Sequence, residues 1–129
     1  MKPRILLLCA GVILATGAGQ VFAHHSFSAT YDSQKRVELE GVVKEMLWRN
    51  PHSFLKIDVA AEDGTTKTWN LEWGSISQLS KLEVTRTTLR PGDKIKIAGE
   101  PARDASSARI LLQYLERPVD GFTWQGKVD

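Results

Sequence analysis

Hydrophobic and polar residues alternate over long stretches of this chain, which is the pattern of half-buried β-strands. The first such stretch covers residues 37–48, and one parity of it carries Val37, Leu39, Gly41, Val43 and Leu47. The second covers residues 53–60 and alternates Leu55, Ile57 and Val59 with Lys56 and Asp58. We therefore predict two consecutive strands over these ranges.

The two strands are separated by a chain reversal at Asn50-Pro51. Proline fixes its own φ and keeps the preceding residue out of the right-handed helical region, so an Asn-Pro pair favours a turn. His52 follows directly and lies close in sequence to Trp48. This places an imidazole at the start of the second strand. Of the three histidines, His52 has the best-defined position in the predicted fold, and it is therefore the leading candidate for a functional site.

A third strand is predicted over residues 66–73, after an Asp63-Gly64 turn of the kind that joins hairpin strands. Its inner face would carry Trp69, Leu71 and Trp73, and Glu72 would lie on the opposite face with no obvious carboxylate partner. The missing partner argues against a glycosidase-like acid pair.

A short helix is predicted after this strand, because Ser75 and Gln78 have the spacing of a capping box. Its expected apolar stripe consists of Ile76, Leu79 and Leu82. Two more strands follow over residues 94–99 and 109–115, the first with Ile95 and Ile97 inward.

Three antiparallel strands, a helix and two further strands form the order of an OB-fold, a five-stranded partly open barrel. We predict a mainly β protein with such an OB-like barrel and one short helix between strands 3 and 4. The alternative is a small α+β sheet with the helix on one face. The predicted organisation is a signal peptide (1–23), an N-terminal arm (24–36), the barrel domain (37–115) and an irregular C-terminal tail (116–129).

Residues 1–23 have the features of a secretory signal peptide. Lys2 and Arg4 precede an apolar run from residue 5 to about residue 15, and Val21 and Ala23 occupy the small-residue positions before a cut. The run is well short of the ~20 apolar residues that span a bilayer. We expect cleavage after Ala23 and no stable membrane anchor afterwards.

Cleavage changes the charge and the cysteine content of the chain. The full sequence has 17 Lys and Arg against 15 Asp and Glu, and cleavage removes Lys2 and Arg4 but no acidic residue. The mature chain is then formally neutral and has no overall field for binding nucleic acid. Cleavage also removes the only cysteine, Cys9, which excludes disulfides, thiolate metal sites and a cysteine nucleophile.

The sequence resembles a family of small exported bacterial proteins classed as a domain of unknown function. Four segments carry the resemblance: His24-His25-Ser26-Phe27, Trp48-Arg49-Asn50-Pro51-His52, Leu71-Glu72-Trp73-Gly74-Ser75 and Leu89-Arg90-Pro91-Gly92-Asp93. The resemblance covers residues 24 to about 115. It implies a periplasmic location and transfers no established activity. More distantly, the chain is similar to exported bacterial OB-fold proteins, which supports the barrel by analogy.

The three histidines are the candidate metal ligands. If the mature chain begins at His24, its α-amine and imidazole can close a chelate ring around a metal, and His52 could supply a further nitrogen. Such a site suits Cu(II), which prefers tetragonal nitrogen and oxygen donors. His25 is the spare or additional ligand. The competing interpretation is that His24 and His25 are solvated arm residues and that His52 only forms hydrogen bonds within the turn.

A second candidate site is a ligand or partner surface, because OB-folds bind oligomers by stacking them on strands 2 and 3. Its residues are Trp48, Asn50, Glu72 and Trp73. The simpler alternative is that the tryptophans belong to the core. Ser26 and Ser53 each adjoin a histidine in sequence, but adjacency is not the geometry of a catalytic triad.

We interpret the chain as an exported periplasmic binding protein rather than an enzyme, with copper as the leading ligand. Its expected partner is a metal ion or another envelope protein, with no nucleic acid. One alternative is an OB-fold module for protein interaction or envelope stress that binds no metal. The other is a copper-dependent oxidase built on the N-terminal histidine.

The signal-peptide interpretation predicts that the purified mature protein begins at His24. Intact-mass measurement and N-terminal sequencing of protein purified from a secreting bacterium check this. A chain that starts elsewhere or retains residues 1–23 would contradict it, and the amine chelate would be lost with it.

Overall fold

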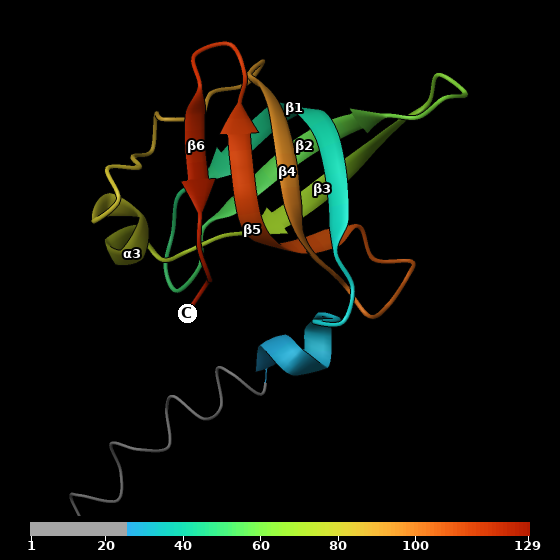
Figure 1. The fold of residues 1–129 in the computed structure, drawn as a ribbon, viewed down its shortest axis with the longest axis horizontal. Coiled ribbons are helices and arrows are strands. Elements are labelled where there is room, and N and C mark those ends of the chain that lie inside the picture. Colours follow the sequence, from blue (N-terminus) through green and yellow to red (C-terminus); the bar gives the residue numbers. More distant parts are fainter. Residues whose placement is uncertain (1–25) are drawn as a thin grey trace, which may run out of the picture.

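A computed structural model of the protein describes residues 26–129. It contains six strands and a helix of one turn, in the chain order β1 (Val37–Leu47), β2 (Phe54–Ala60), β3 (Thr66–Glu72), α3 (Ile76–Ser80), β4 (Lys94–Pro101), β5 (Arg109–Arg117) and β6 (Phe122–Gln125). Residues 26–30 form a further helical turn ahead of β1. Figure 1 shows the strands wrapped into a barrel, with α3 beside it.

The barrel closes through a parallel pairing of β3 with β5. Antiparallel pairs join the other strands in the order β3-β2-β1-β4-β5, and β6 extends the sheet beyond β5. The closing register pairs Asn70 with Arg109, Leu71 with Ile110 and Glu72 with Leu111. The protein is mainly β, with a closed five-stranded barrel, one additional strand and only short helices, which confirms the fold class predicted from the sequence.

The inward residues of all five barrel strands share one core with α3, its following connection and β6. Its buried members are Val43, Leu55, Ile57, Leu71, Trp73, Leu79, Val84, Leu89, Ile95, Ile97, Ile110, Leu112, Leu115 and Trp124. The predicted inward positions Leu71, Ile95 and Ile97 are confirmed as buried. Trp69, nearer the β2–β3 turn, is only partly buried.

A β-bulge changes which residues of β1 face inward. Val43 pairs with Ile57 but Glu45 pairs with Lys56, so one extra residue is inserted at Lys44. Beyond the bulge Met46 lies opposite the buried Leu55, and Leu47 lies opposite Phe54. The expectation that Leu47 shares the inner parity of Val43 is therefore wrong, because an inserted residue reverses the alternation.

The helix begins as predicted but buries less than expected. Ser75 is its N-cap, and the Ser75 hydroxyl accepts a hydrogen bond from the backbone N–H of Gln78 at 3.1 Å. Leu79 is fully buried, whereas Leu82 is 54% exposed. The helix ends at Ser80, so the helical spacing that would have turned Leu82 inward does not continue.

The C-terminal segment is not irregular throughout, in contrast to the prediction. Residues Phe122–Gln125 form β6, which pairs antiparallel with β5. Trp124 enters the core and packs edge-on against Trp73, with 5.4 Å between the ring centroids. Trp124 and Phe122 of this short strand thus pack with the barrel core.

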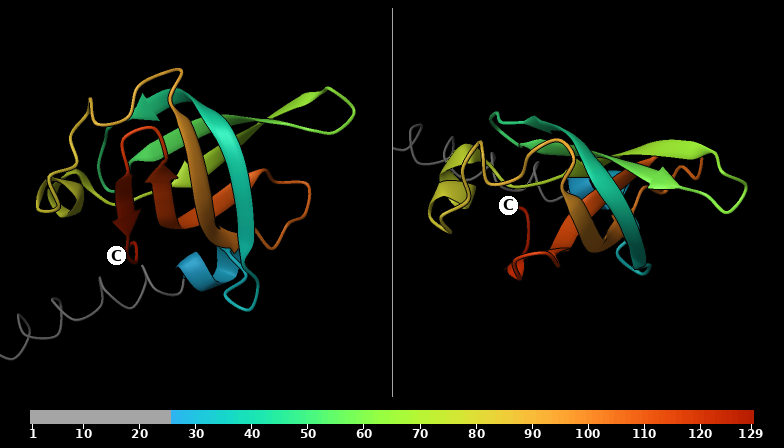
Figure 2. Two further views of the ribbon diagram at one scale, coloured as in Figure 1. Left: turned by 45° about the horizontal axis from the view of Figure 1, so that its top comes forward. Right: turned by 90° about the horizontal axis from the view of Figure 1, so that it is seen from above.

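The β2–β3 hairpin extends beyond the barrel, as Figures 1 and 2 show. β1 pairs with β4 over Val37–Val42 and with β2 only from Val42 onward. The last residues of β2 therefore pair with β3 alone. β3 pairs with β5 only from Asn70, so the end of the hairpin is a two-stranded ribbon.

The arm that precedes β1 is fixed to the loop between β4 and β5. Tyr31 forms an isolated bridge with Ala102, and the Asp32 N–H donates to the Pro101 carbonyl at 2.9 Å. Arg103 donates from its backbone to the Thr30 carbonyl and from its side chain to the Ser28 carbonyl. These contacts hold the arm against one end of the barrel.

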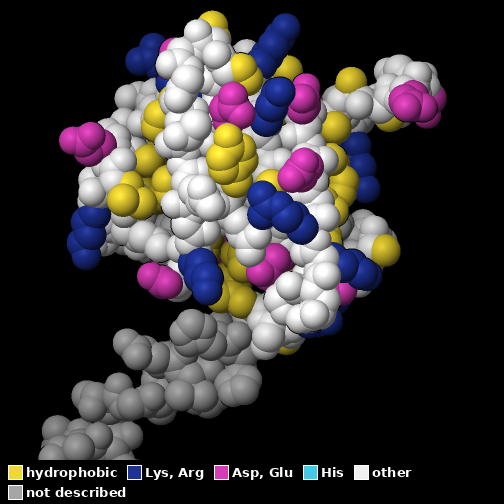
Figure 3. All heavy atoms as spheres, in the orientation of Figure 1, with side chains coloured by type: hydrophobic (Ala, Val, Ile, Leu, Met, Phe, Trp, Pro, Cys, Tyr) yellow, Lys and Arg dark blue, Asp and Glu magenta, His cyan; other side chains and the backbone are white. Residues whose placement is uncertain are grey.

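The surface of the barrel carries mixed charges. Figure 3 shows Lys and Arg side chains interspersed with Asp and Glu over the face that it presents. Within residues 26–129, no helix combines the length and the apolar character needed to cross a bilayer.

The core predicts a sharp contrast between two leucine truncations. Leu55→Ala removes a fully buried side chain and should lower the free energy of unfolding by about 2–5 kcal/mol. Leu82→Ala, the same chemical change at an exposed position, should have a far smaller effect. Urea unfolding followed by tryptophan fluorescence measures both. Equal losses would contradict the assignment of the core.

Candidate functional site

His52 is held by backbone hydrogen bonds at the open end of the β2–β3 hairpin, opposite its turn. These bonds continue the pairing of the two strands beyond Phe54 and Glu72. The Ser53 N–H donates to the Gly74 carbonyl at 2.9 Å, and the Trp73 N–H donates to the Ser53 carbonyl at 2.8 Å. Ser53 is fully buried. This pairing fixes the residue just before it and directs the His52 side chain to the same face of the sheet as Glu72.

The His52 ring contacts the carboxylate of Glu72. Nδ1 lies 2.9 Å from Glu72 Oε1, and the His52 side chain retains 19% of its exposure. The ring is therefore partly open to solvent. An ionised carboxylate can only accept, so the hydrogen of this contact belongs to Nδ1.

Glu72 is only 7% exposed although it lies on the outer face of the barrel. The cover comes from a small apolar cluster in which Tyr31, Leu111 and Val128 are buried and Phe27 packs against them. The arm and the C-terminal segment thus close over this part of the sheet. The sequence correctly predicts the face of Glu72, but not that this carboxylate would be covered.

Three side chains donate to the Glu72 carboxylate. Besides His52, the Tyr31 hydroxyl donates to Oε2, and an Arg109 guanidinium N–H donates to the same oxygen at 3.0 Å. We call these four residues, Tyr31, His52, Glu72 and Arg109, the Glu72 cluster. Burial, followed by the hydrogen bond to Glu72, raises the pKa of Tyr31 above its usual range, so its hydroxyl keeps the proton that it donates.

The other nitrogen of His52 faces the covering segments. Nε2 lies 3.0 Å from the backbone oxygen of Asp129, and the Phe27 ring centroid is 5.1 Å from that of His52. Gln78 holds the C-terminal segment by donating to the Lys127 carbonyl at 2.7 Å. Both ring nitrogens of His52 therefore face oxygen acceptors, and a neutral ring can donate to only one of them.

Aromatic rings surround the arginine of the cluster. The Arg109 guanidinium carbon lies 5.8 Å from the Tyr31 ring centroid and 5.8 Å from the Phe54 ring centroid. Arg49 lies 4.9 Å from the same Phe54 ring. These contacts fall within the range of cation–π interactions and fix the guanidinium that neutralises Glu72.

A family model of unknown function, DUF6152, matches residues 11–110. The chain belongs to the DUF6152 family. This confirms the resemblance to an uncharacterised family that the sequence motifs indicated. The matched range contains all four residues of the Glu72 cluster. No curated protein and no solved structure matches the chain.

Two of the three candidate metal ligands of this DUF6152 protein, His24 and His25, lie outside the described residues. Within residues 26–129, no group of three or more His, Cys, Asp or Glu side chains is arranged to hold a metal ion. Among the described residues, His52 pairs with one carboxylate, that of Glu72, and any metal at its Nε2 would need further donors.

The four residues of the candidate partner surface do not form one exposed surface. Trp73 is fully buried, so its assignment to that surface is wrong and it acts as a core residue. Trp48 is partly buried and packs against the core. Asn50 is exposed, and its side-chain oxygen accepts from the backbone N–H of Ile76 at 3.0 Å. Glu72 belongs instead to the cluster with His52.

Sequence reasoning missed Tyr31, Arg109 and the proximity of His52 to Glu72. The register of the β2–β3 hairpin carries a signal for the last of these. The hairpin turn sets Ala60 opposite Thr66, and counting back along both strands sets Phe54 opposite Glu72. His52 then lies diagonally across from Glu72 on the same face. Arg109 depends on barrel closure, and Tyr31 depends on docking of the arm.

The Glu72 cluster predicts an unequal effect for two tyrosine substitutions. Tyr31→Phe removes one donor from a buried carboxylate and should lower the free energy of unfolding by about 1–3 kcal/mol. Tyr114→Phe removes a hydroxyl that donates to the only partly buried Glu116, and its effect should be much smaller. Chemical unfolding of both variants makes the comparison. A tolerated Tyr31→Phe would show that the hydroxyl does not support Glu72.

Proposed function

We propose that the protein is an exported periplasmic binding protein for copper, with Cu(II) bound by His24 and His52. The observation that carries the proposal is the 2.9 Å contact between His52 Nδ1 and the buried carboxylate of Glu72. Metal-binding histidines almost always donate their second ring N–H to a carboxylate, a carbonyl or water, which fixes the ring and raises its basicity. His52 has this support before any metal binds.

The rigidity of Glu72 strengthens this support. Its second oxygen is held by Tyr31 and Arg109, so the carboxylate cannot easily turn away from the imidazole. The cluster therefore orients Nε2 toward the side of the barrel where the arm lies. Preorganised donors of this kind reduce the ordering that a metal must otherwise impose.

The described part of the arm contacts His52 close to the proposed start of the mature chain. The Phe27 ring packs against the His52 ring, and His24 precedes Phe27 by three residues. A fully extended chain of three residues spans at most about 10 Å. A mature chain that begins at His24 could thus supply an α-amine and an imidazole to a metal at His52 Nε2, with His25 as an additional ligand.

The surroundings of Nε2 suit a cation. Its neighbour, the backbone oxygen of Asp129, is an acceptor, and Glu72 on the opposite side of the ring is an anion. A Cu(II) bound at Nε2 would exchange the contact with Asp129 for a metal bond and leave the ring hydrogen on Nδ1, where it faces Glu72. Cu(II) accepts nitrogen and oxygen donors together, so the Asp129 oxygen is compatible with the same site.

Copper titration of the mature protein and of one extended variant tests the proposal. The variant carries one Met before His24, which keeps every side chain but converts the α-amine into a peptide bond. We expect one Cu(II) per mature chain, much weaker binding in the extended form and weaker binding of Zn(II) than of Cu(II). Calorimetry measures the affinities, and electron paramagnetic resonance detects nitrogen couplings to the copper.

Substitutions separate the ligand from the residue that positions it. His52→Ala should abolish most of the affinity, and Glu72→Gln should weaken it by about 10–100-fold. His25→Ala should weaken it less than His52→Ala. Unfolding curves recorded for each variant identify any loss that comes from misfolding. Equal affinity in the mature and extended forms, or a copper signal without nitrogen couplings, would reject the site and favour a module that binds no metal.

A further inference from the structure

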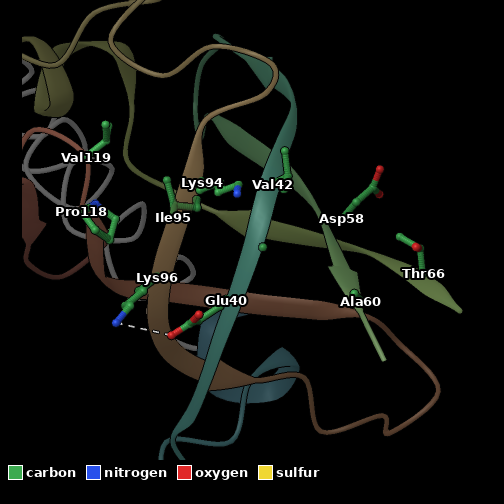
Figure 4. Close-up of a pocket in the computed structure, with 11 residues that line it drawn as sticks. Glu40, Val42, Asp58, Ala60, Thr66, Lys94, Ile95, Lys96, Pro118 and Val119 are labelled. Carbon is green, nitrogen blue, oxygen red and sulfur yellow. Dashed lines mark ion pairs between the residues drawn. The ribbon is translucent and has the colours of Figure 1, made fainter. Parts of the chain in front are cut away.

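A shallow groove of about 530 Å³ crosses the outer face of β1, away from the Glu72 cluster. It runs from the loop between β5 and β6, over β4 and β1, to the β2–β3 hairpin (Figure 4). Its apolar lining comes mainly from Val42, Ala60, Pro118 and Val119, since Ile95 also borders the groove but is only 2% exposed. No residue of this β1 groove belongs to the Glu72 cluster, so the two sites are separate.

The β1 groove is lined by hydrophobic side chains that are exposed to solvent. Of the three large hydrophobic side chains that are exposed within residues 26–129, two line it: Val42 at 38% and Val119 at 87% exposure. The third, Leu82, lies outside the groove. Single exposed hydrophobic residues are ordinary, but residues from separate elements that line one hollow indicate a binding surface.

The charges around the β1 groove leave one cation without a counterion. Lys96 pairs with Glu40 at 3.4 Å, and Lys44 pairs with the groove residue Asp58 at 3.4 Å. Lys94, which also lines the groove, forms no ion pair with any of the described residues. Figure 4 shows Lys94 in the middle of the β1 groove, between Val119 and Val42. The groove therefore offers one free positive charge within an apolar lining.

We propose that the β1 groove binds a free medium-chain aliphatic carboxylate, with its anionic head at Lys94 and its alkyl chain along the apolar lining. Two interstrand spacings separate β4 from β2 across β1, which gives a length of roughly 10 Å. An extended octanoate chain is about this long. The groove volume falls within the range of small-molecule sites, about 300–1,000 Å³.

The paired charges argue for this occupant over a protein surface. A flat partner covering the β1 groove would also cover the Glu40–Lys96 and Lys44–Asp58 pairs, and desolvating ion pairs is costly. A narrow ligand that lies along the apolar lining of the β1 groove leaves both ion pairs exposed to water. Its carboxylate can contact Lys94 because that ammonium has no competing partner.

Binding of octanoate, measured by NMR titration of the full mature chain, tests the proposal. We expect a saturable shift of the Val42 methyl resonances, because the alkyl chain would run from Lys94 across β1. Octanol, which has the same chain without the charge, should bind about fivefold more weakly, as expected for the loss of one surface charge contact. Lys94→Gln should weaken octanoate by about the same factor and leave octanol unchanged.

Two matched variants control for nonspecific effects. Lys81→Gln removes an exposed lysine outside the groove, and Leu82→Asn removes an exposed hydrophobic residue outside it. Neither should change octanoate binding, whereas Val42→Asn should weaken it severalfold. The proposal is overturned by the absence of saturable binding, by equal affinity for octanoate and octanol, or by an unchanged affinity in Lys94→Gln. Shifts that depend on protein concentration alone would instead assign the groove to a second copy of the chain.

Discussion

The Glu72 carboxylate receives hydrogen bonds from three segments of the chain: the arm, the turn before β2, and β5. A buried charge is costly unless it is paired and fully hydrogen-bonded, and breaking one partner of a buried pair leaves an uncompensated charge. The native arrangement meets this requirement only when all three segments are in place. Arm docking, the turn at His52 and barrel closure therefore depend on one another.

The need for partners from several segments is consistent with the position of the Glu72 cluster on the outer face of the barrel. The buried core consists of aliphatic residues and two tryptophans. On the outer face, the arm and the C-terminal segment supply cover, while Arg109 and His52 still reach water at their edges. A partly exposed imidazole backed by a buried anion is an arrangement that a barrel interior could not provide.

The alternation of residues was sufficient to predict the five barrel strands and the inward positions Leu71, Ile95 and Ile97, but not β6. The N-cap at Ser75 followed from its spacing to Gln78. Each of these signals is local. Leu47 was assigned to the wrong face, because a single inserted residue at Lys44 leaves no mark in the polar pattern. Position 52 was identified, but Tyr31 and Arg109 were missed. Their roles arise from contacts between distant segments, which alternation does not encode.

The outer part of the β2–β3 hairpin, unlike the Glu72 cluster, has few contacts with the rest of the fold. Its outer part is paired on one side only, and a two-stranded ribbon is marginally stable without further packing. It can open locally while the barrel remains folded. Its free backbone edges would also be templates for pairing with another chain, and the charged residues Glu62, Asp63 and Lys67 at its end oppose such aggregation.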